Sequence, residues 1–336
     1  MTTADTFTRA DIENYPFPLS RDQYRYSTNV EPAGRPVSTA AGGWGDRRVQ
    51  IDRHYRHELD ERARILARDP SRAQCLPHMA PAAWDAMLTL MRDLATDYPE
   101  SMHLDRDLIN DNTFRWRNDL LDIDDTFTFG DASTLPTGPL DYICGQIQED
   151  VVLLDQREGQ LWGDAGVVTF AADWSFGFDI GMSFLQIHGP VPRVHSEKII
   201  TRAHDFLLRL EPGQSYRRTN WTLTVDGKLD TATETYPEWG RDRRTLADGP
   251  LEDVGQRLFL RTEVQHLIRL PHSGAVMFLI RTYLLPLAAV ATVDSWADRL
   301  YRVLEDLPLD MAEYKGLART RGPALRWLST FGGVTP

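Results

Sequence analysis

Hydrophobic side chains in two segments of the first hundred residues recur at the three- and four-residue spacing of an amphipathic helix. We therefore predict packed helices over 50–70 and 80–98. In the second segment the repeating side chains are Trp84, Met87, Leu88, Leu90, Met91 and Leu94. Residues 1–50 mix proline, glycine and serine with scattered aromatic residues, which predicts an extended arm.

From Asp150 the pattern changes to short apolar runs that are separated by polar turns. The runs 151–154 and 166–170 lie on either side of the polar residues 156–159. Apolar runs of this length around a turn that contains glycine are typical of a β-hairpin, so we predict two paired strands here.

Helices are predicted next, at 180–185 and 196–210, with Ser196 as the N-cap of the second. Three further strands follow, the last two joined by a turn at 271–274. These strands are predicted at 217–225, 259–269 and 275–284. Helices over 294–330 close the chain. The order predicts an α+β fold with an antiparallel sheet flanked by helices.

The polar stretch from 226 to 256 is too long for an ordinary connection between neighbouring strands. It contains Tyr236, Trp239 and three arginines, Arg241, Arg243 and Arg244. We interpret it as a lid or as a docking surface for another protein. A disordered or purely decorative insertion is the alternative.

Composition limits the class of protein. The chain has 336 residues, 42% of them hydrophobic, which is enough to bury a substantial core as one large or two small domains. No run approaches the roughly 18 apolar residues that cross a bilayer, and the N-terminus lacks a signal-peptide pattern, so we expect a cytoplasmic protein without membrane association. The net charge of -12 argues against nucleic acid as a partner.

Two motifs of metal or redox proteins can be set aside. Cys75 and Cys144 are too few for a disulfide framework and do not form a Cys-x-x-Cys-His site. The run from His54 to Glu58 is similar to a zinc-protease helix, but Glu61 stands where the second histidine is needed. We interpret that run as a solvated helix face.

Charged residues interrupt the otherwise apolar strands of the second half. They are Arg218, Arg261, Glu263, Arg269 and Arg281. An unpaired buried ion costs several kcal/mol, so these residues face solvent, pair with one another, or bind something charged. Strand alternation places Arg261, Glu263 and Gln265 on one face, and we favour that face as functional.

His188 lies in the run IHGPVP (187–192), where two prolines restrict the backbone and end the preceding helix. An imidazole on such a stiff helix-loop junction needs little rearrangement to bind a metal. A structural histidine, hydrogen-bonded to a backbone carbonyl, is the alternative.

Six segments together resemble the heme-dependent oxidative N-demethylase alpha subunit family, over roughly residues 15 to 330. They are IHGPVP (187–192), RRTNW (217–221), LRTEVQHL (260–267), RLPHSGAV (269–276), IRTY (280–283) and AEYKGL (312–317). Their order and approximate spacing follow the family pattern. Any single segment could arise by chance, whereas the ordered set is specific.

The resemblance implies a PAS-like heme-binding core, at 146–290, between an N-terminal arm and helical extension at 1–145 and a C-terminal helical extension at 291–336. It implies a noncovalent heme b that activates O2 and oxidises a small secondary amine, dimethylamine, to methylamine and formaldehyde. The electrons would come from a separate NADPH-dependent reductase subunit that carries FMN and a 2Fe-2S cluster. A further subunit would bind tetrahydrofolate.

The resemblance also assigns roles to residues. His188 is the expected iron ligand, with His195 as its alternative. Glu263, Arg218 and Tyr283 are the expected catalytic residues, Glu263 holding the substrate ammonium or accepting its proton. Four further residues are expected to bind the heme or complete the network around it: Arg261, Arg281, Asn220 and Trp221.

Three other functions stay open. The first is a heme-dependent N-hydroxylase of a guanidine or amino acid substrate. The second is a noncatalytic PAS heme gas sensor, although no output segment is visible in the sequence. The third is a heme-free structural subunit, in which His188 is a loop residue.

Overall fold

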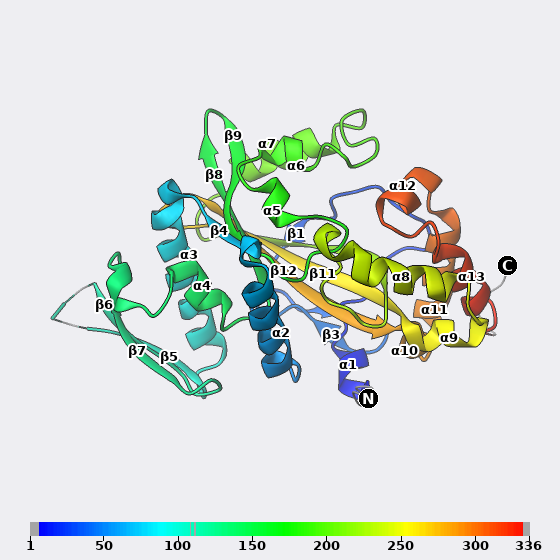
Figure 1. Cartoon of the computed structure of the whole chain (residues 1–336), viewed down its shortest axis with the longest axis horizontal. Coiled ribbons are helices and arrows are strands. Elements are labelled where there is room, and N and C mark those ends of the chain that lie inside the picture. Colours follow the sequence, from blue (N-terminus) through cyan, green and yellow to red (C-terminus); the bar gives the residue numbers. More distant parts are fainter. Residues whose placement is uncertain (1–6, 108, 111, 332–336) are drawn as a thin grey trace.

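The computed structural model describes residues 7–107, 109–110 and 112–331. Its centre is an antiparallel sheet of seven strands (Figure 1). In spatial order these are β1 (Glu31–Pro32), β10 (Ser215–Val225), β11 (Leu258–Arg269), β12 (Val276–Pro286), β8 (Asp150–Arg157), β9 (Gln160–Val167) and β4 (Ala73–Cys75). The predicted hairpin is present, but its second strand lies at 160–167 and so begins six residues before the predicted range 166–170. The three later strands are confirmed.

The hairpin strands β8 and β9 are joined to the three later strands through β12. β12, the last strand, pairs with β8, the first of the five long strands, with Leu279 opposite Val151. Between β9 and β10 the chain leaves the sheet and forms three short helices, α5 (Phe176–Asp179), α6 (Phe184–Ile187) and α7 (Ile199–Leu208). The order of two strands, helices and three strands is therefore as predicted.

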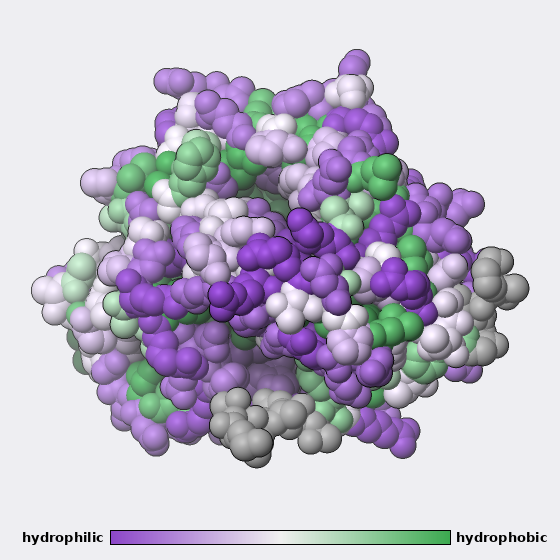
Figure 2. All heavy atoms as spheres, turned by 45° about the vertical axis from the view of Figure 1, so that its right-hand side comes forward, coloured by the Kyte–Doolittle hydropathy of each residue, from purple (hydrophilic) through white to green (hydrophobic). Residues whose placement is uncertain are grey.

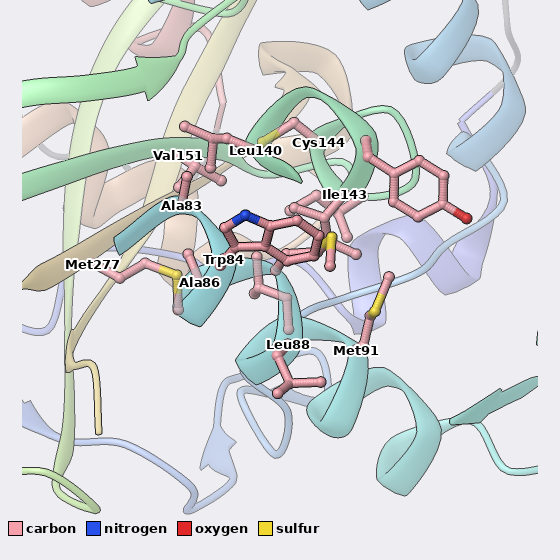
Figure 3. Close-up of a cluster of buried hydrophobic side chains, with 14 of the residues drawn as sticks. Ala83, Trp84, Ala86, Leu88, Met91, Leu140, Ile143, Cys144, Val151 and Met277 are labelled. Carbon is pink, nitrogen blue, oxygen red and sulfur yellow. The ribbon is translucent and has the colours of Figure 1, made fainter. Parts of the chain in front are cut away.

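One face of the sheet, which we call the α3 face, carries Val151, Met277 and Leu279. It packs against α3 (Ala80–Asp97) and α4 (Pro139–Cys144) in the largest hydrophobic cluster. Figure 3 shows Trp84 of α3 among residues of α4, with Val151 and Met277 nearby. The predicted amphipathic face of 80–98 is thus the centre of this core.

The opposite face, which we call the α7 face, carries Val152, Leu267 and Val276. It packs against Phe176 of α5 and Leu207 of α7. The α5–α7 segment therefore forms a separate layer over the sheet, and the α3 core lies on the other side.

The helix predicted at 196–210 starts later than expected. α7 begins at Ile199, and Lys198 before it has a left-handed backbone with φ 54. Ser196 does not cap the helix, because its hydroxyl donates to the Arg193 carbonyl at 3.1 Å. Residues 193–198 form turns in which Arg193 also has a positive φ of 58, and a helix cannot continue through that conformation.

A small three-stranded sheet was not predicted. It consists of β5 (Met102–Arg106), β6 (Thr113–Asn118) and β7 (Ile123–Thr128). Phe114 and Trp116 are buried while Arg115 between them is exposed, so the alternation of a strand is present in the sequence. The strands contain many charged residues, so their sequence lacks the apolar runs from which the other strands were predicted.

The remaining helices surround the end of the sheet near β10. The insertion at 226–256 is ordered and forms α8 (Tyr236–Ala247) and α9 (Leu251–Arg257), so the prediction of a disordered segment is wrong. The closing helices are confirmed as α11 (Asp294–Asp306), α12 (Leu309–Tyr314) and α13 (Arg321–Leu328). Among the described residues, none of the helices combines the length and hydrophobicity that a membrane-crossing helix requires.

The remaining helices and strands are α1, β2 and β3 in the arm, the helix α2, and the short helix α10. The arm contains α1 (Arg9–Glu13) and the hairpin β2 (Val37–Ser38) and β3 (Gly43–Trp44). α2 (Tyr55–Arg68) confirms the helix predicted at 50–70, and α10 (Leu287–Val290) follows β12. The arm is otherwise extended, as predicted.

Candidate functional site

His188 directly follows α6 and lies in the layer over the α7 face. The helix starts with a capping box, in which the Ser183 hydroxyl accepts from the Gln186 amide and the Gln186 side chain accepts from the Ser183 amide. Four residues later His188 Nδ1 lies 2.8 Å from the Phe184 carbonyl oxygen. A carbonyl only accepts, so Nδ1 carries the proton and Nε2 offers a lone pair.

The His188 ring is neutral near pH 7. Burial lowers its pKa to about 4, and the nearby Arg218 lowers it further, while the bond to the Phe184 carbonyl opposes the shift. Its Nε2 has no hydrogen-bond partner within the described part of the chain. A neutral imidazole with one nitrogen fixed by a carbonyl is the form that ligates a metal, and the carbonyl orients the ring.

Polar side chains of β10 and β11 form a connected network on the α7 face. Arg218 Nη1 donates to Gln265 Oε1 at 2.7 Å, and Gln265 Nε2 donates to Glu263 Oε2 at 3.0 Å. Asn220 Nδ2 donates to the same Glu263 oxygen at 3.3 Å. Cross-strand register explains the arrangement, because Arg218 is opposite Gln265 and Asn220 is opposite Glu263.

Arg261 fixes the other Glu263 oxygen, with Nε 3.2 Å from Oε1. Its other nitrogens donate to the Leu229 carbonyl at 2.7 Å, the Phe170 carbonyl and the Thr282 hydroxyl. Four of the five N–H groups therefore bind protein acceptors, and the side chain is 0% exposed, so Arg261 holds two loops against the sheet and is not accessible to a ligand. The alternation predicted for Arg261, Glu263 and Gln265 is confirmed by these contacts.

Lys315, the residue directly after α12, also belongs to the network, although it lies 95 residues after Asn220 in the chain. Its Nζ donates to the Trp221 carbonyl at 2.8 Å and to Asn220 Oδ1 at 3.2 Å. Its backbone carbonyl accepts from the Thr222 hydroxyl at 2.8 Å. Burial lowers the Lys315 pKa to about 8, with a further contribution from Arg218, so most of the amine is protonated at pH 7.

Partly exposed apolar side chains accompany this polar network. They belong to the hydrophobic cluster of the α7 face and are Trp174, Ile180, Phe184, Phe206, Tyr216 and Phe278. The Phe184 ring lies 4.3 Å from the His188 ring. Figure 2 shows the surface hollowed below the top of the molecule, with hydrophobic atoms inside the hollow, and in Figure 1 that top contains α6 and α7. A mainly apolar hollow with a few polar groups is typical of a cofactor site.

The residues of this site fit a noncovalent heme. His188 supplies one imidazole with a free Nε2, and the apolar side chains around it suit a flat hydrophobic macrocycle. Cys144 does not compete as a ligand, since it is fully buried in the α3 core and burial raises the pKa of its thiol.

His195, the alternative ligand, is placed differently. Its side chain is exposed, in the turns between α6 and α7. His204 on α7 is buried, and its Nε2 has no partner among the described residues. Of these three histidines, only His188 lies beside Arg218 and the polar network.

Arg281 and Tyr283 lie on the α3 face, away from Glu263. Register pairs Arg281 with Val264 and Tyr283 with Thr262, so both side chains point to the opposite side of the sheet. Arg281 Nη1 binds Glu58 of α2 at 2.8 Å. The structure therefore does not bring these two residues to the network on the α7 face.

The Glu58 contact also corrects the interpretation of α2. Glu58 is 6% exposed and binds Arg281 and Gln148, so it does not belong to a solvated helix face. Its neighbour His57 is exposed, as expected. Arg281, the partner of Glu58, lies 223 residues further along the chain, so the local sequence pattern could not indicate the pair.

The ring and the backbone carbonyl of Trp221 make contacts on different sides of the sheet. Its ring points to the α3 face with Leu223, and its carbonyl accepts from Lys315 on the α7 side. The Lys315 amine lies 5.0 Å from the centre of the Trp221 ring. Trp221 thus contacts the network through its backbone carbonyl and the face of its ring.

Three contributors to the site were not predicted as site residues. Lys315 is one, although it lies in the AEYKGL segment that supports the family resemblance. The other two come from the arm: the Thr28 carbonyl accepts from Arg218 Nε at 2.9 Å, and the Tyr26 hydroxyl donates to the Pro192 carbonyl at 2.7 Å. Only a tertiary contact could reveal these last two.

A cluster elsewhere has the residue types of a metal site. His78, Asp155 and Asp164 bring three ligand atoms within 4.8 Å of one another. Arg157 donates to both carboxylates, at 2.7 Å to Asp155. A guanidinium between two carboxylates balances their charge, so we treat the cluster as an ion-pair network.

The sequence was also compared with known protein families. A family model described as haem-dependent oxidative N-demethylase, alpha subunit-like, matches residues 42–325. The match covers every strand of the seven-stranded sheet except β1 and includes every side chain of the polar network.

Proposed function

The chain belongs to the haem-dependent oxidative N-demethylase alpha subunit-like family, and from this premise we propose that it is the heme-binding subunit of an amine-oxidising enzyme. The proposed substrate is a small secondary amine, with dimethylamine as the first candidate. The observation that carries the proposal is His188, whose Nδ1 is fixed by a carbonyl and whose Nε2 is free beside partly exposed apolar side chains.

The fold supports a heme site on the α7 face. The sequence of two strands, three helices and three strands is the order of a PAS-like core, and α5–α7 cover one face of that sheet. We propose that heme b lies between this layer and the sheet, with His188 as the iron ligand.

When bound, the heme would supply the redox chemistry. The proposed overall reaction consumes dimethylamine, O2, two electrons and two protons, and yields methylamine, formaldehyde and water. A separate reductase subunit would deliver the electrons, in keeping with the family's description as an alpha subunit.

Glu263 is the proposed substrate-facing carboxylate. It is 6% exposed, and its two oxygens are oriented by Arg261, Gln265 and Asn220. An oriented carboxylate can bind the ammonium of the substrate and accept its proton. Arg261 and Gln265 would then position Glu263.

An absorption spectrum tests the proposal. We expect the purified protein to show a heme spectrum that changes with dithionite and again with dimethylamine. His188→Ala should lose the heme or its axial coordination, while His195→Ala, at the exposed alternative ligand, should keep the spectrum of the unaltered protein. An unchanged spectrum in His188→Ala would remove His188 as the ligand. No heme after reconstitution would overturn the proposal.

One observation favours a second candidate, N-hydroxylation of an amino acid or a guanidine that carries a carboxylate. The network contains the cations Arg218, Arg261 and Lys315 but only one carboxylate, Glu263. Such a site accepts an anion more readily than a simple cation. Formaldehyde release from dimethylamine distinguishes N-demethylation from this alternative.

A further inference from the structure

The polar network on the α7 face carries more positive than negative charge. Arg261 forms an ion pair with Glu263 at 3.2 Å. Within the described residues, Arg218 and Lys315 have no carboxylate within ion-pair distance, even though both contact the same network. The network therefore has two cations in excess.

The Lys315 amine is fixed in position by the protein but donates only two hydrogen bonds to the described residues. Two of its three protons go to neutral acceptors, the Trp221 carbonyl and the Asn220 amide oxygen. Its backbone is also fixed, because its carbonyl accepts from Thr222. The third proton has no acceptor among the described residues.

Arg218 shows the same pattern. Its Nε donates to the Thr28 carbonyl and its Nη1 to the Gln265 side chain, both neutral acceptors. Its Nη2 has no partner among the described residues. Burial lowers the pKa of Arg218, which means that its surroundings already disfavour an uncompensated charge.

Both side chains keep partial access to solvent although they lie between the sheet and the covering segments. Partly exposed side chains in such a position can be reached by a ligand, and we call the place where Arg218, Lys315 and His188 lie the His188 recess. His188 shares this property and lies close enough to Arg218 for its pKa to be lowered by it.

Two half-buried cations without counter-ions are costly unless an anion pairs with them. We propose that Arg218 and Lys315 form a carboxylate-binding pair at the edge of the His188 recess. The inference rests on the proposed function and adds to it the chemical class of group that these residues recognise. Two sources can supply the carboxylate: the heme propionates or the carboxylate of an amino acid substrate.

The geometry suits a carboxylate. Each cation donates part of its N–H groups to the protein and keeps at least one without a partner among the described residues, so each can offer a charge-assisted hydrogen bond to a carboxylate. The two heme propionates would also balance the two excess charges.

The first arm of the test measures the affinity of the apoprotein for hemin and for hemin dimethyl ester, whose propionates are blocked. The variants are Arg218→Gln and Lys315→Met. If the pair binds propionates, each variant should bind hemin about tenfold or more weakly, because a charge-assisted bond is lost. Affinity for the ester should stay as in the unaltered protein. Lys315→Arg should restore part of the hemin affinity.

The second arm uses the heme-loaded protein and follows the spectral response to sarcosine, a secondary amine with a carboxylate, and to dimethylamine. If the pair binds a substrate carboxylate, both variants should bind hemin normally and should need about tenfold more sarcosine for the same response. The response to dimethylamine should not change.

Matched controls remove Arg209, exposed beside α7, and Lys228, which pairs with Asp242 outside the recess. Arg209→Gln and Lys228→Met should leave both arms unchanged. Normal affinity of Arg218→Gln and Lys315→Met for hemin and sarcosine would overturn the carboxylate pair and leave the proposed function standing. Absence of hemin binding by the unaltered protein would overturn both.

Discussion

Glu263 connects the two halves of the polar network through its separate oxygens. Oε1 accepts from Arg261, and Oε2 accepts from Gln265 and Asn220. An amide in its place keeps the size of the side chain but cannot hold a proton or pair with an ammonium.

We expect Glu263→Gln to lower kcat/KM for the amine by about a hundredfold or more, the usual scale for loss of a general base. Heme content and the Soret maximum should stay unchanged, because Glu263 is not a proposed ligand. Turnover with a reconstituted reductase and heme titration measure the two properties. Full activity would make Glu263 a structural partner of Arg261.

His266 is buried like His204 but lies on the α3 face, and neither of its ring nitrogens has a partner among the described residues. Burial lowers its pKa from 6.5 to about 3, and the cations Arg217 and Arg48 lower it further. The ring therefore stays neutral in the folded protein at pH values where the unfolded chain binds a proton.

The direction of the pH effect follows from this difference. Above pH 6.5 the ring is neutral in both states, and between pH 6.5 and about 3 only the unfolded state takes up the proton, so stability falls as the pH falls. We expect His266→Leu to leave stability at pH 7 nearly unchanged and to raise it by about 2 kcal/mol at pH 4.5.

Urea unfolding at pH 7 and pH 4.5 measures this effect. His57→Leu, on the exposed side of α2, is the control and should change neither value much. An equal stability change at both pH values would mean that His266 does not contribute to the acid sensitivity.

At the level of elements, Arg269 of β11 joins the sheet to the C-terminal end of α7. Its guanidinium donates to the carbonyls of Leu210 at 2.8 Å, Leu207 at 2.7 Å and Leu208 at 3.2 Å, and to Gly274 at 2.6 Å. Helix ends leave carbonyls without internal partners, and one buried side chain satisfies three of them here.

Arg269→Met should lower the free energy of unfolding by about 3 kcal/mol, because several buried carbonyls lose their donor together. It should also loosen the layer that carries His188. Chemical denaturation and heme-dissociation rates measure the two effects. Arg209→Met, at the exposed end of the same helix, should have little effect on either. A stability equal to that of the unaltered protein would show that water replaces the guanidinium without cost.

The sequence predicted elements where the hydrophobic pattern is local. The strands β8, β10, β11 and β12 follow from apolar runs, and α3 follows from its period of hydrophobic residues. β9 lies mostly before the apolar run at 166–170 that predicted it. The start of α7 was missed by three residues because turns with positive φ at Arg193 and Lys198 leave no simple composition signal.

The site was predictable in part for the same reason. Alternation along β11 placed Glu263 and Gln265 together, and the proline-rich run singled out His188. Arg281 and Tyr283 could not be assigned to a face relative to Glu263 until the register of β11 and β12 was known, since a shift of one residue reverses every side chain.

At the level of the whole molecule, the N-terminal arm crosses from one end of the sheet to the His188 recess. Tyr15 is 2% exposed, and its hydroxyl donates to the Leu260 carbonyl at 2.6 Å. Further along, Tyr26 contacts the loop after His188 and Thr28 accepts from Arg218. The arm therefore contributes to both the core and the recess.

Removal of residues 1–30 should lower the free energy of unfolding by about 3 kcal/mol or more, because burial of Tyr15 alone contributes on that scale. It should also speed heme loss, since Tyr26 and Thr28 are removed. The control is removal of residues 1–13, which leaves all three residues in place. Thermal unfolding and heme transfer to an acceptor protein measure the outcome. Equal heme retention in both truncations would show that the arm does not support the recess.

The two outer strands of the main sheet have a consequence for how copies of this chain can associate. β1 has two residues, one of them Pro32, which lacks an N–H group, and β4 has three. Neither presents a run of backbone donors and acceptors long enough to recruit another chain by strand addition. Strand addition at β1 or at β4 is thereby disfavoured as a way for copies of this chain to associate.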